Sequence, residues 1–330
     1  MKKKALYMVA VFGLILTTAC GNPKLKNGEE VIAKINGKEY TANDLYKELK
    51  GQYGYNTVIN WIDSVIADKE VETTDEIKKQ VDDDITYYQQ YASAYQMTLP
   101  QFASSYMGLN NINSEKDLRD FLLKSRKLNA AVEKQVASKV KDSEAKDYYD
   151  ENYKTVYNYK EIVLANDDDA KNNIKKIKSE LKGLKNDKLV SKFEELAKKY
   201  STKKDKITYE NATKNSVNEK IWNKLKKLDD KEVSDEIEVD SDYHFILKIS
   251  KGKAKDFKDV KEEIKKSIAQ EKLSKDQYLS YDILIELRNK YKLVFFDSDL
   301  KKGYDDFKKQ LVEAKDNAKN SNSNSNSNEK

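Results

Sequence analysis

The first apolar and polar positions after residue 30 alternate with the period of a strand and then change to the period of a helix. Residues 31–41, VIAKINGKEYT, alternate around Asn36-Gly37, the dipeptide that most strongly favours a two-residue hairpin turn. Thr41 then precedes Asp44 at the spacing of a capping box, and apolar residues follow at helical spacing. The pattern therefore predicts a β-hairpin that leads directly into a helix.

Three later helix starts have the same form, a hydroxyl residue followed three positions later by a side-chain acceptor. They are Thr73 with Glu76, Thr98 with Gln101, and Ser114 with Asp117. The last of them opens a long helix with an apolar stripe formed by Leu118, Phe121, Leu122, Leu128, Val132 and Val136. The sequence predicts separate helices here, the longest with a face to bury.

The middle of the chain predicts a small α/β unit. YKEIVLA (159–165) has the composition of a strand, residues 168–184 and a segment from Phe193 have helical periods, and a short helical segment spans 221–228. The strand SDYHFILKIS (241–250) closes the unit, after a polar stretch at 203–216. The expected order is β-α-α-α-β.

The helical period returns from residue 256 and continues to about residue 287. It ends at YKLVFFDSDL (291–300), a strand-like run. Residues 301–330 are expected to be a polar tail, disordered at its SNSNSNSN end, because this composition buries too little apolar surface to fold.

The N-terminus predicts export. Lys2, Lys3 and Lys4 precede an apolar run of signal-peptide length, and small residues lead to Cys20. This pattern resembles the lipobox of bacterial lipoproteins, with Thr17 where leucine is usual. It implies a signal peptide at 1–19 and lipidation of Cys20, with residues 20–30 as lipidated terminus and spacer. The alternative is an ordinary signal peptide that leaves one free thiol.

Composition excludes several classes of function. Cys20 is the only cysteine and His244 the only histidine, so neither a disulfide nor a cysteine-based zinc site can form. Without the three signal lysines, 59 basic residues face 57 acidic ones, which is too even for nucleic-acid binding. The Asp82–Asp84 and Asp167–Asp169 triplets lack the glycine turn and distal glutamate of a calcium loop, and we interpret them as helix capping. We expect no metal and no cofactor.

Several segments together resemble a known family. FEELAKKYST (193–202), LDDKEVS (228–234) and DYHFILKI (242–249) are similar to conserved segments of parvulin-type prolyl isomerases. With the lipoprotein-like signal, VIAKINGKEYTANDLYKEL and the closing helix, they resemble PrsA-type foldase lipoproteins and their SurA-type relatives. The resemblance covers nearly all of the mature chain.

The resemblance implies an α+β, mostly helical fold. In it, a helical chaperone module is built from N-terminal and C-terminal segments and carries an inserted parvulin-like domain. The corresponding boundaries are 31–141 for the N-terminal helical segment, 142–253 for the parvulin-like domain and 254–300 for the C-terminal helix and strand.

The parvulin-like part departs from the family where the chemistry lies. Parvulins pair two facing histidines, but only His244 is present, and Lys160 or Glu161 stands where the first histidine is usual. The family's glycine-rich loop is also missing, because residues 203–216 contain no glycine. Ile221, Trp222 and Phe245 are expected around the pocket. We leave two interpretations open: His244 is a hydrogen-bonded strand residue, or a pocket around it retains some isomerase activity.

The resemblance also implies binding of unfolded exported polypeptides. The tyrosine-rich segment offers Tyr87, Tyr88, Tyr91, Tyr95 and Met97 as a client surface, since aromatic and methionine side chains accept varied apolar segments. The alternative is that these tyrosines, four residues apart, form the buried face of a bundle.

The expected function is that of a foldase or chaperone outside the cytoplasm, anchored to the membrane of a Gram-positive bacterium by lipid. A homodimer is a further candidate assembly. The two competing functions are an active prolyl isomerase with an altered site and a solute-binding lipoprotein.

Overall fold

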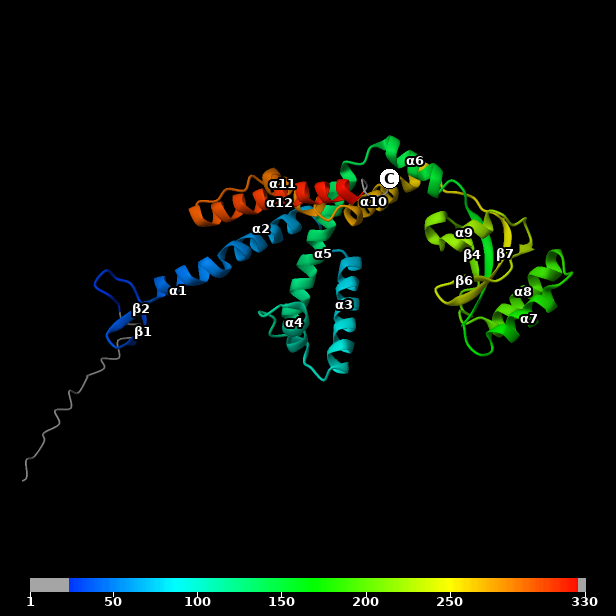
Figure 1. Ribbon diagram of the computed structural model, residues 1–330, viewed down its shortest axis with the longest axis horizontal. Coiled ribbons are helices and arrows are strands. Elements are labelled where there is room, and N and C mark those ends of the chain that lie inside the picture. The colour runs from blue at the N-terminus through cyan, green and yellow to red at the C-terminus, as the bar shows by residue number, and fades with distance from the viewer. Residues whose placement is uncertain (1–23, 326–330) are drawn as a thin grey trace, which may run out of the picture. The chain divides into compact units, whose positions relative to one another are not determined.

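The computed structural model describes residues 24–325, so the predicted signal peptide and Cys20 lie outside the described residues (Figure 1). The chain divides into two compact units. Among the described residues, one is formed by residues 24–65 together with 292–325, and the other by residues 66–291. In the part of the chain that is described, no helix has the length and apolar character needed to cross a membrane.

The first unit begins with the predicted hairpin. Strands β1 (Val31–Ile35) and β2 (Lys38–Thr41) are antiparallel. Asn36 and Gly37 form the turn with φ values of 48° and 79°, the left-handed conformations that this type of turn requires. Helix α1 (Ala42–Leu49) follows directly, and the backbone N–H of Asp44 donates to Thr41 Oγ1 at 3.1 Å. The hairpin and this capping box are confirmed.

A short π-helical segment, η1 (Lys50–Gly54), joins α1 to α2 (Tyr55–Glu70). The ammonium group of Lys50 lies 2.6 Å from Asp297 and 2.7 Å from Asp299, and these hydrogen bonds raise the pKa of Lys50. At Gly303 an added Cβ would lie 3.1 Å from the ring of Tyr55. The lack of a side chain at Gly303 therefore allows the C-terminal segment to approach the start of α2 closely.

The prediction for the C-terminal segment is wrong in two respects. The strand-like run at 291–300 is a turn and loop that leads into a helix, and Lys292 adopts a left-handed φ of 57°. The expected polar tail is largely helical, because α12 spans Ser298–Ser325. Tyr304 and Leu311 are buried on one side of α12, and the ring of Phe295 packs against Tyr304 at 5.4 Å. Apolar residues at helical spacing thus sit within the polar sequence.

The second unit opens with three helices, α3 (Asp75–Ala94), α4 (Leu99–Met107) and α5 (Glu115–Ser138). The predicted caps Thr98 and Ser114 are confirmed, whereas α3 is capped by Thr74, one residue after the predicted Thr73. The helices share a core of Val81, Ile85, Leu118 and Leu122. The Asp82–Asp84 triplet lies within α3 and not at its start, and Asp84 binds Arg126 through two nitrogens at 2.6–2.9 Å.

Three further helices complete the helical part of this unit: α6 (Asp142–Asn152), α10 (Phe257–Lys275) and α11 (Leu279–Lys290). Val140, Ala145, Val260 and Ile264 form the core between α6 and α10. At its N-terminus α6 is tied to α10 by Asp142, whose hydrogen bonds to Lys261 and Lys265 lower its pKa to about 2.

A five-stranded antiparallel sheet forms the rest of the unit, in the order β4-β3-β7-β5 with β6 also paired to β7. Its strands are β3 (Tyr157–Leu164), β4 (Thr208–Ala212), β5 (Glu232–Val233), β6 (Ile237–Val239) and β7 (Asp242–Lys251). The two predicted strands are β3 and β7, which pair along their whole length. The polar segment at 203–216 contains β4, which the sequence interpretation missed.

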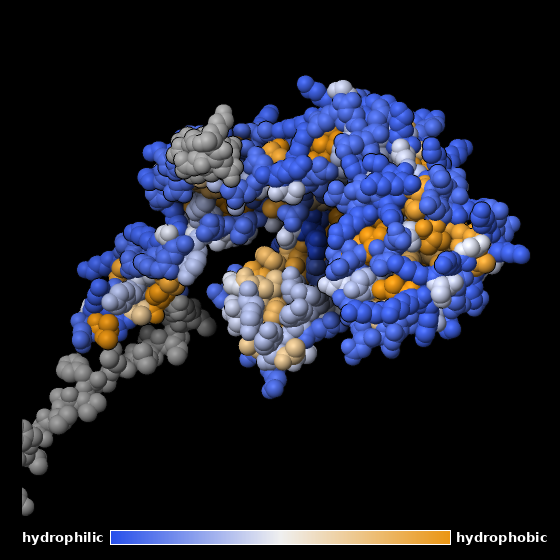
Figure 2. Space-filling view, turned by 45° about the vertical axis from the view of Figure 1, so that its right-hand side comes forward, coloured by the Kyte–Doolittle hydropathy of each residue, from blue (hydrophilic) through white to orange (hydrophobic). Residues whose placement is uncertain are grey.

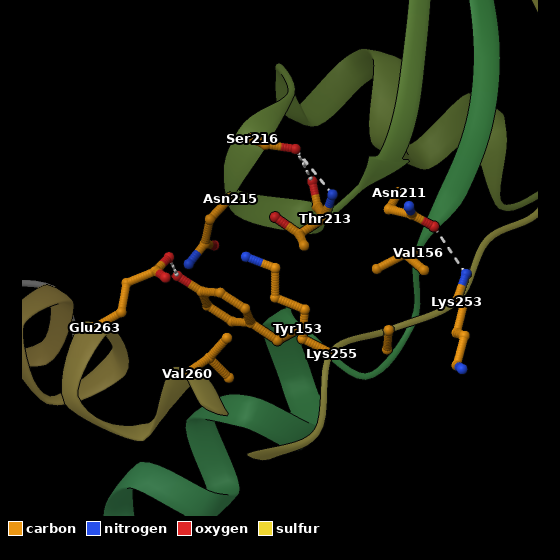
Figure 3. A pocket seen from close by; sticks show the side chains of 11 residues that line it. Tyr153, Val156, Asn211, Thr213, Asn215, Ser216, Lys253, Lys255, Val260 and Glu263 are labelled. Atoms are coloured by element: carbon orange, nitrogen blue, oxygen red, sulfur yellow. Dashed lines mark hydrogen bonds between the residues drawn. The ribbon is translucent and has the colours of Figure 1, made fainter. Parts of the chain in front are cut away.

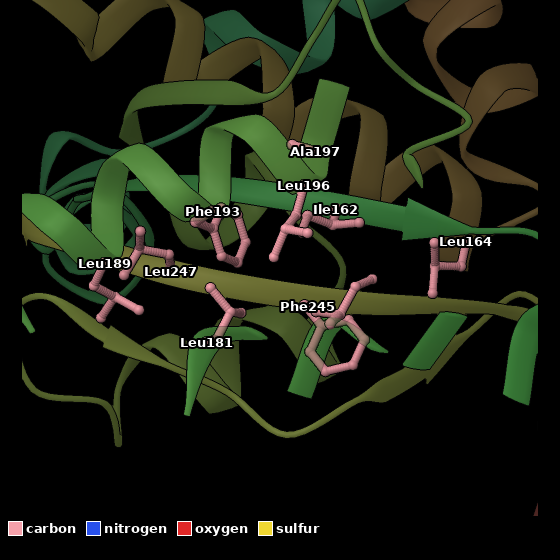
Figure 4. Packing of buried hydrophobic residues seen from close by; sticks show 10 residues of the cluster. Ile162, Leu164, Leu181, Leu189, Phe193, Leu196, Ala197, Phe245 and Leu247 are labelled. Atoms are coloured by element: carbon pink, nitrogen blue, oxygen red, sulfur yellow. The ribbon is translucent and has the colours of Figure 1, made fainter. Parts of the chain in front are cut away.

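Helices α7 (Ala170–Leu181) and α8 (Asn186–Tyr200) cover one face of this sheet, while the 3-10 turn η2 (Lys214–Ser216) leads into α9 (Glu219–Leu225) at the other (Figure 1). Beneath α7 and α8, Phe193 and Leu196 pack against Ile162, Phe245 and Leu247 (Figure 4). The predicted class, α+β and mostly helical, is confirmed.

Candidate functional site

His244 is not isolated. It lies in β7 opposite Val163 of β3, and its Nδ1 is 2.8 Å from Glu161 Oε1. Both side chains are enclosed, with relative exposures of 6% for His244 and 4% for Glu161. A carboxylate only accepts hydrogen bonds, so the contact with Glu161 requires a hydrogen on Nδ1. Nε2 is the ring nitrogen that Glu161 does not bind. Of the two residues expected at the position of the missing histidine, Glu161 is the one that meets His244.

The pleat of the sheet explains this meeting. Successive side chains of a strand point to opposite faces, so Glu161 and Tyr159 share one face of β3, while Ile162 lies on the other. On β7, His244 and Ile246 share that same face. Glu161 faces Ile246 directly, and His244 is its diagonal neighbour, within reach of a long side chain.

Lys160 points away from this pair. Its ammonium group lies 2.9 Å from Glu194 of α8 and donates to Thr208 Oγ1 at 2.8 Å. The two adjacent charged residues of YKEIVLA therefore have separate roles, one on each face of the strand.

Two tyrosines adjoin the buried pair. Tyr159 of β3 and Tyr209 of β4 stack with ring centroids 4.6 Å apart and an interplanar angle of 3°. Burial raises the pKa of both phenols, and the negative charge of Glu161 raises them further. Both tyrosines therefore stay neutral at physiological pH. Tyr209 was not expected from the sequence, because it comes from the polar segment at 203–216.

The predicted pocket residues divide between the two faces. Ile221 and Trp222 of α9 are buried on the His244 face, where Trp222 packs against Tyr157 at 5.2 Å. Phe245 belongs to the opposite core beneath α7 and α8, so its assignment to the pocket is wrong (Figure 4). The physical reason is strand alternation, since Phe245 directly follows His244 in β7.

This arrangement limits the chemistry that the site can perform. Rotation of a prolyl bond has a barrier of roughly 18–20 kcal/mol and requires no proton to leave the substrate. A catalyst must therefore present an accessible apolar pocket and free polar groups to the twisted amide. Here the imidazole is enclosed, and one of its two nitrogens is bound by Glu161. The arrangement matches the interpretation of His244 as a hydrogen-bonded strand residue.

A second candidate site is the aromatic surface of α3 and α4, which we define by Tyr87, Tyr91, Tyr95 and Tyr106. These side chains are exposed, between 44% and 57%. Ring contacts join Tyr87 to Tyr91 at 4.5 Å and Tyr95 to Tyr106 at 5.4 Å. The buried face of α3 is formed by Ile77, Val81, Ile85 and Ala92 instead. The tyrosines at 87, 91 and 95 are therefore surface residues and not the buried face of a bundle.

The exposed tyrosines of the aromatic surface pack against buried and half-buried side chains. Tyr106 stacks on the buried ring of Phe102 at 5.0 Å, and Tyr88, which is half-buried, contacts Tyr87 and Phe102. Met97 is also half-buried and lies in the turn between α3 and α4. Figure 2 shows pale and orange side chains over the lobe formed by α3 and α4, in contrast to the blue of most of the visible surface.

Among the described residues, no group of three or more His, Cys, Asp or Glu side chains could hold a metal ion. The Asp167–Asp169 triplet directly precedes α7, and Asp169 is its N-terminal cap residue, although its side chain accepts no capping hydrogen bond.

The fold is α+β and mostly helical, with a five-stranded antiparallel sheet domain. No protein-family model matches the chain. Curated relatives do: Foldase protein PrsA of Geobacillus kaustophilus is 28% identical over 303 residues, covering 87% of this chain and 95% of that protein. Foldase protein PrsA of Bacillus subtilis is 26% identical over 309 residues, covering 91% and 93%.

Among solved structures, the chain is similar to foldase protein PrsA from Streptococcus pneumoniae. The TM-score is 0.56 at 20% identity, and the match covers 83% of this chain and 98% of that one. This likeness shows the fold. Together with the curated relatives, it confirms the resemblance to PrsA-type foldases that the sequence predicts.

Proposed function

We propose that the chain is a foldase that acts as a chaperone for exported proteins outside the cytoplasm, tethered to the membrane through a lipidated Cys20. Similarity to proteins named foldase protein PrsA supports the foldase and chaperone role. The observation that carries the proposal is the exposed aromatic surface of α3 and α4.

This surface suits transient contacts with unfolded chains. A tyrosine ring offers a large apolar face at low conformational cost, and its hydroxyl tolerates water, so the surface remains soluble without a client. An unfolded segment can lie across several rings without a fixed register. The proposed mechanism is therefore weak shielding of apolar segments, without nucleotide, while a lipid tether raises the local concentration of the foldase near the site of translocation.

Replacing Tyr87, Tyr91 and Tyr95 together by alanine is expected to weaken binding of an unfolded client about tenfold, because three exposed rings are removed. The measurement is suppression of light scattering from thermally unfolding citrate synthase at a series of chaperone concentrations. The matched control replaces the same three residues by phenylalanine, which keeps the rings and should retain suppression. Equal suppression by the alanine and phenylalanine variants would remove this surface from the function.

We further propose that residues 142–253 form a parvulin-like domain with weak or no isomerase activity. The support is the enclosed Glu161–His244 pair in place of two facing histidines. The domain then serves as a second client surface or spacer. A solute-binding function has less support, because the described residues contain one five-stranded sheet and not two similar α/β lobes.

The isomerase proposal has a direct test. In a protease-coupled assay with a prolyl tetrapeptide, His244→Ala is expected to change any observed acceleration by less than about twofold, because His244 does not present a free group to the substrate. Near-ultraviolet circular dichroism verifies that the variant is folded. A folded variant that loses most of a strong acceleration would instead establish the competing function, an active isomerase with an altered site.

A homodimer remains a proposal for the assembled state. Sedimentation velocity on the purified chain over a range of concentrations would show whether it forms.

A further inference from the structure

A pocket of about 340 Å³ lies beside the two chain segments that connect the helices of the second unit to its sheet (Figure 3). Tyr153 and Val156 line one side, residues 253–255 line another, and η2 with the residues before it lines a third. Val260 and Glu263 of α10 complete the lining. The pocket is separate from the Glu161–His244 pair and from the aromatic surface.

The backbone beside the pocket is held in place by specific contacts. The N–H of Lys253 donates to Asn211 Oδ1 at 2.8 Å, and the Tyr149 hydroxyl donates to the carbonyl of Lys255, also at 2.8 Å. At Gly252 an added Cβ would lie only 2.5 Å from Asn211 Oδ1, so a larger residue would force the Asn211 side chain to shift. The connection from β7 to α10 is therefore fixed, and with it the position of Lys255.

Three charged side chains line this pocket: Lys253, Lys255 and Glu263. In Figure 3 the Lys253 side chain points away from Thr213 and Asn215, and Lys255 and Glu263 do not form an ion pair with each other. Within residues 24–325, no acidic side chain forms an ion pair with Lys255, and Glu263 forms none with a basic one. Neighbouring lysines are already paired, Lys214 with Glu151 at 2.5 Å and Lys261 with Asp142 at 2.6 Å. In Figure 3 the ammonium group of Lys255 points into the pocket, toward Thr213 and Asn215.

The remaining lining groups supply hydrogen-bond donors and apolar contact. Asn215 Nδ2 donates one hydrogen to Tyr148 Oη at 2.8 Å, which leaves its second N–H free to donate. The Thr213 hydroxyl can also donate. Tyr153 donates to Glu263 Oε1 at 3.1 Å, and burial raises the pKa of Tyr153, which keeps it a neutral donor. Val156, Val260 and the Tyr153 ring provide apolar walls.

We propose that this pocket binds a carboxylate of a client polypeptide, with Lys255 as its charge partner and Thr213 and Asn215 as hydrogen-bond donors. The carboxylate can come from an Asp or Glu side chain or from a chain terminus. The pocket volume is at the low end for ligand sites, which suits one residue of a peptide. The proposal rests on the foldase function, since it takes clients to be polypeptides. It adds a preference for client segments that carry a carboxylate, which the aromatic surface does not provide.

Titration of the isotope-labelled chain with short peptides, followed by amide NMR, tests the proposal. The first probe is an acetylated, amidated hexapeptide of Gly, Ser and Ala with one internal Glu, and its reference has Gln at that position. A second pair, without Glu, differs only in a free or amidated C-terminus. The Glu peptide, the free-terminus peptide or both should shift amides at 211–216 and 252–256, and their neutral partners should not. Which pair responds identifies the source of the carboxylate.

Two variants should move the affinity in opposite directions. Lys255→Gln removes the charge partner and should raise the Kd about fivefold, as for an exposed charged contact. Glu263→Gln removes a repelling charge while keeping an acceptor for Tyr153, and should lower the Kd about twofold. The matched control is Lys204→Gln, an exposed lysine in the loop after α8, which makes the same change in net charge and should leave the Kd unchanged.

The proposal is overturned if the acidic and neutral peptides shift the pocket amides equally, or if Lys204→Gln weakens binding as much as Lys255→Gln. The result is also independent of the chaperone assay. Selective peptide binding together with full suppression by the triple tyrosine variant would contradict the aromatic surface and leave the pocket standing. Loss of suppression in the triple tyrosine variant, without selective binding of the acidic peptides, would contradict the pocket alone.

Discussion

The Glu161→Ala variant is expected to lose roughly 2–4 kcal/mol of unfolding free energy, because it leaves the buried imidazole of His244 without its hydrogen-bond partner. Water cannot easily replace the carboxylate, since both side chains are almost fully enclosed and neighbour the stacked Tyr159 and Tyr209. The loss should appear as a lower urea midpoint for the sheet domain.

Trp222 offers a local measurement of this unfolding. The chain has two tryptophans, of which Trp222 is buried against Tyr157 and Trp61 is exposed. In a Trp61→Phe background, fluorescence therefore reports the core on the His244 face. Glu161→Gln, which keeps an acceptor of similar shape, should cost less than Glu161→Ala.

The double variant Glu161→Leu with His244→Leu decides the interpretation. Two apolar side chains of similar volume leave no unsatisfied group, so this variant should recover most of the lost stability. If the double variant is as unstable as Glu161→Ala, the hydrogen-bonded pair itself stabilises the sheet domain, and apolar packing of similar volume cannot replace it. If Glu161→Ala is as stable as the parent, the pair is not a structural contact at all.

The features that sequence predicts well are local ones. The hairpin turn at Asn36-Gly37 and the caps at Thr41, Thr98 and Ser114 depend on residues within four positions of each other. Their physical causes are a left-handed turn and a side chain that satisfies a free N–H. All the residues involved lie within a short stretch of sequence, so the turn and the caps occur at the predicted residue or one residue away from it.

The partner of His244 could not be assigned in this way. Glu161 lies 83 positions earlier in the chain, and its meeting with His244 depends on the register of β3 against β7. The sequence did contain a hint, since a charged pair interrupts the apolar strand YKEIVLA. Choosing between Lys160 and Glu161 required knowing which face of β3 points to α9, because a shift of one residue exchanges the two faces.

Strand β4 and helix α12 were missed for another reason. TYENA (208–212) has the polar composition of a loop, and only pairing with β3 makes it a strand. In α12, Tyr304, Phe307 and Leu311 recur at helical spacing but are diluted by lysine and aspartate. Tertiary contact overrides local composition in both cases. Tyr209, which adjoins the buried pair, was hidden because it belongs to one of these segments.

Phe193→Ala is expected to destabilise the sheet domain by about 3–5 kcal/mol, because Phe193 is fully buried between α8 and the sheet and its removal leaves a cavity. The buried residues around it, among them Ile177, Leu196 and Leu247, surround it on several sides and cannot collapse without moving the helices. Trp222 fluorescence in the Trp61→Phe background should again report the loss as a lower urea midpoint. Val190→Ala, at a half-buried position of the same helix, is the control and should cost about 1 kcal/mol.

The same variant separates the two parts of the proposed function. The aromatic surface belongs to α3 and α4, whose core of Val81, Ile85, Leu118 and Leu122 shares no residue with the core around Phe193. At a urea concentration or temperature that unfolds the sheet domain of Phe193→Ala, suppression of client aggregation should therefore persist. Circular dichroism would verify that the helices remain. Loss of suppression together with the sheet domain would mean that clients are held chiefly by the sheet domain, and the aromatic surface would lose its leading role.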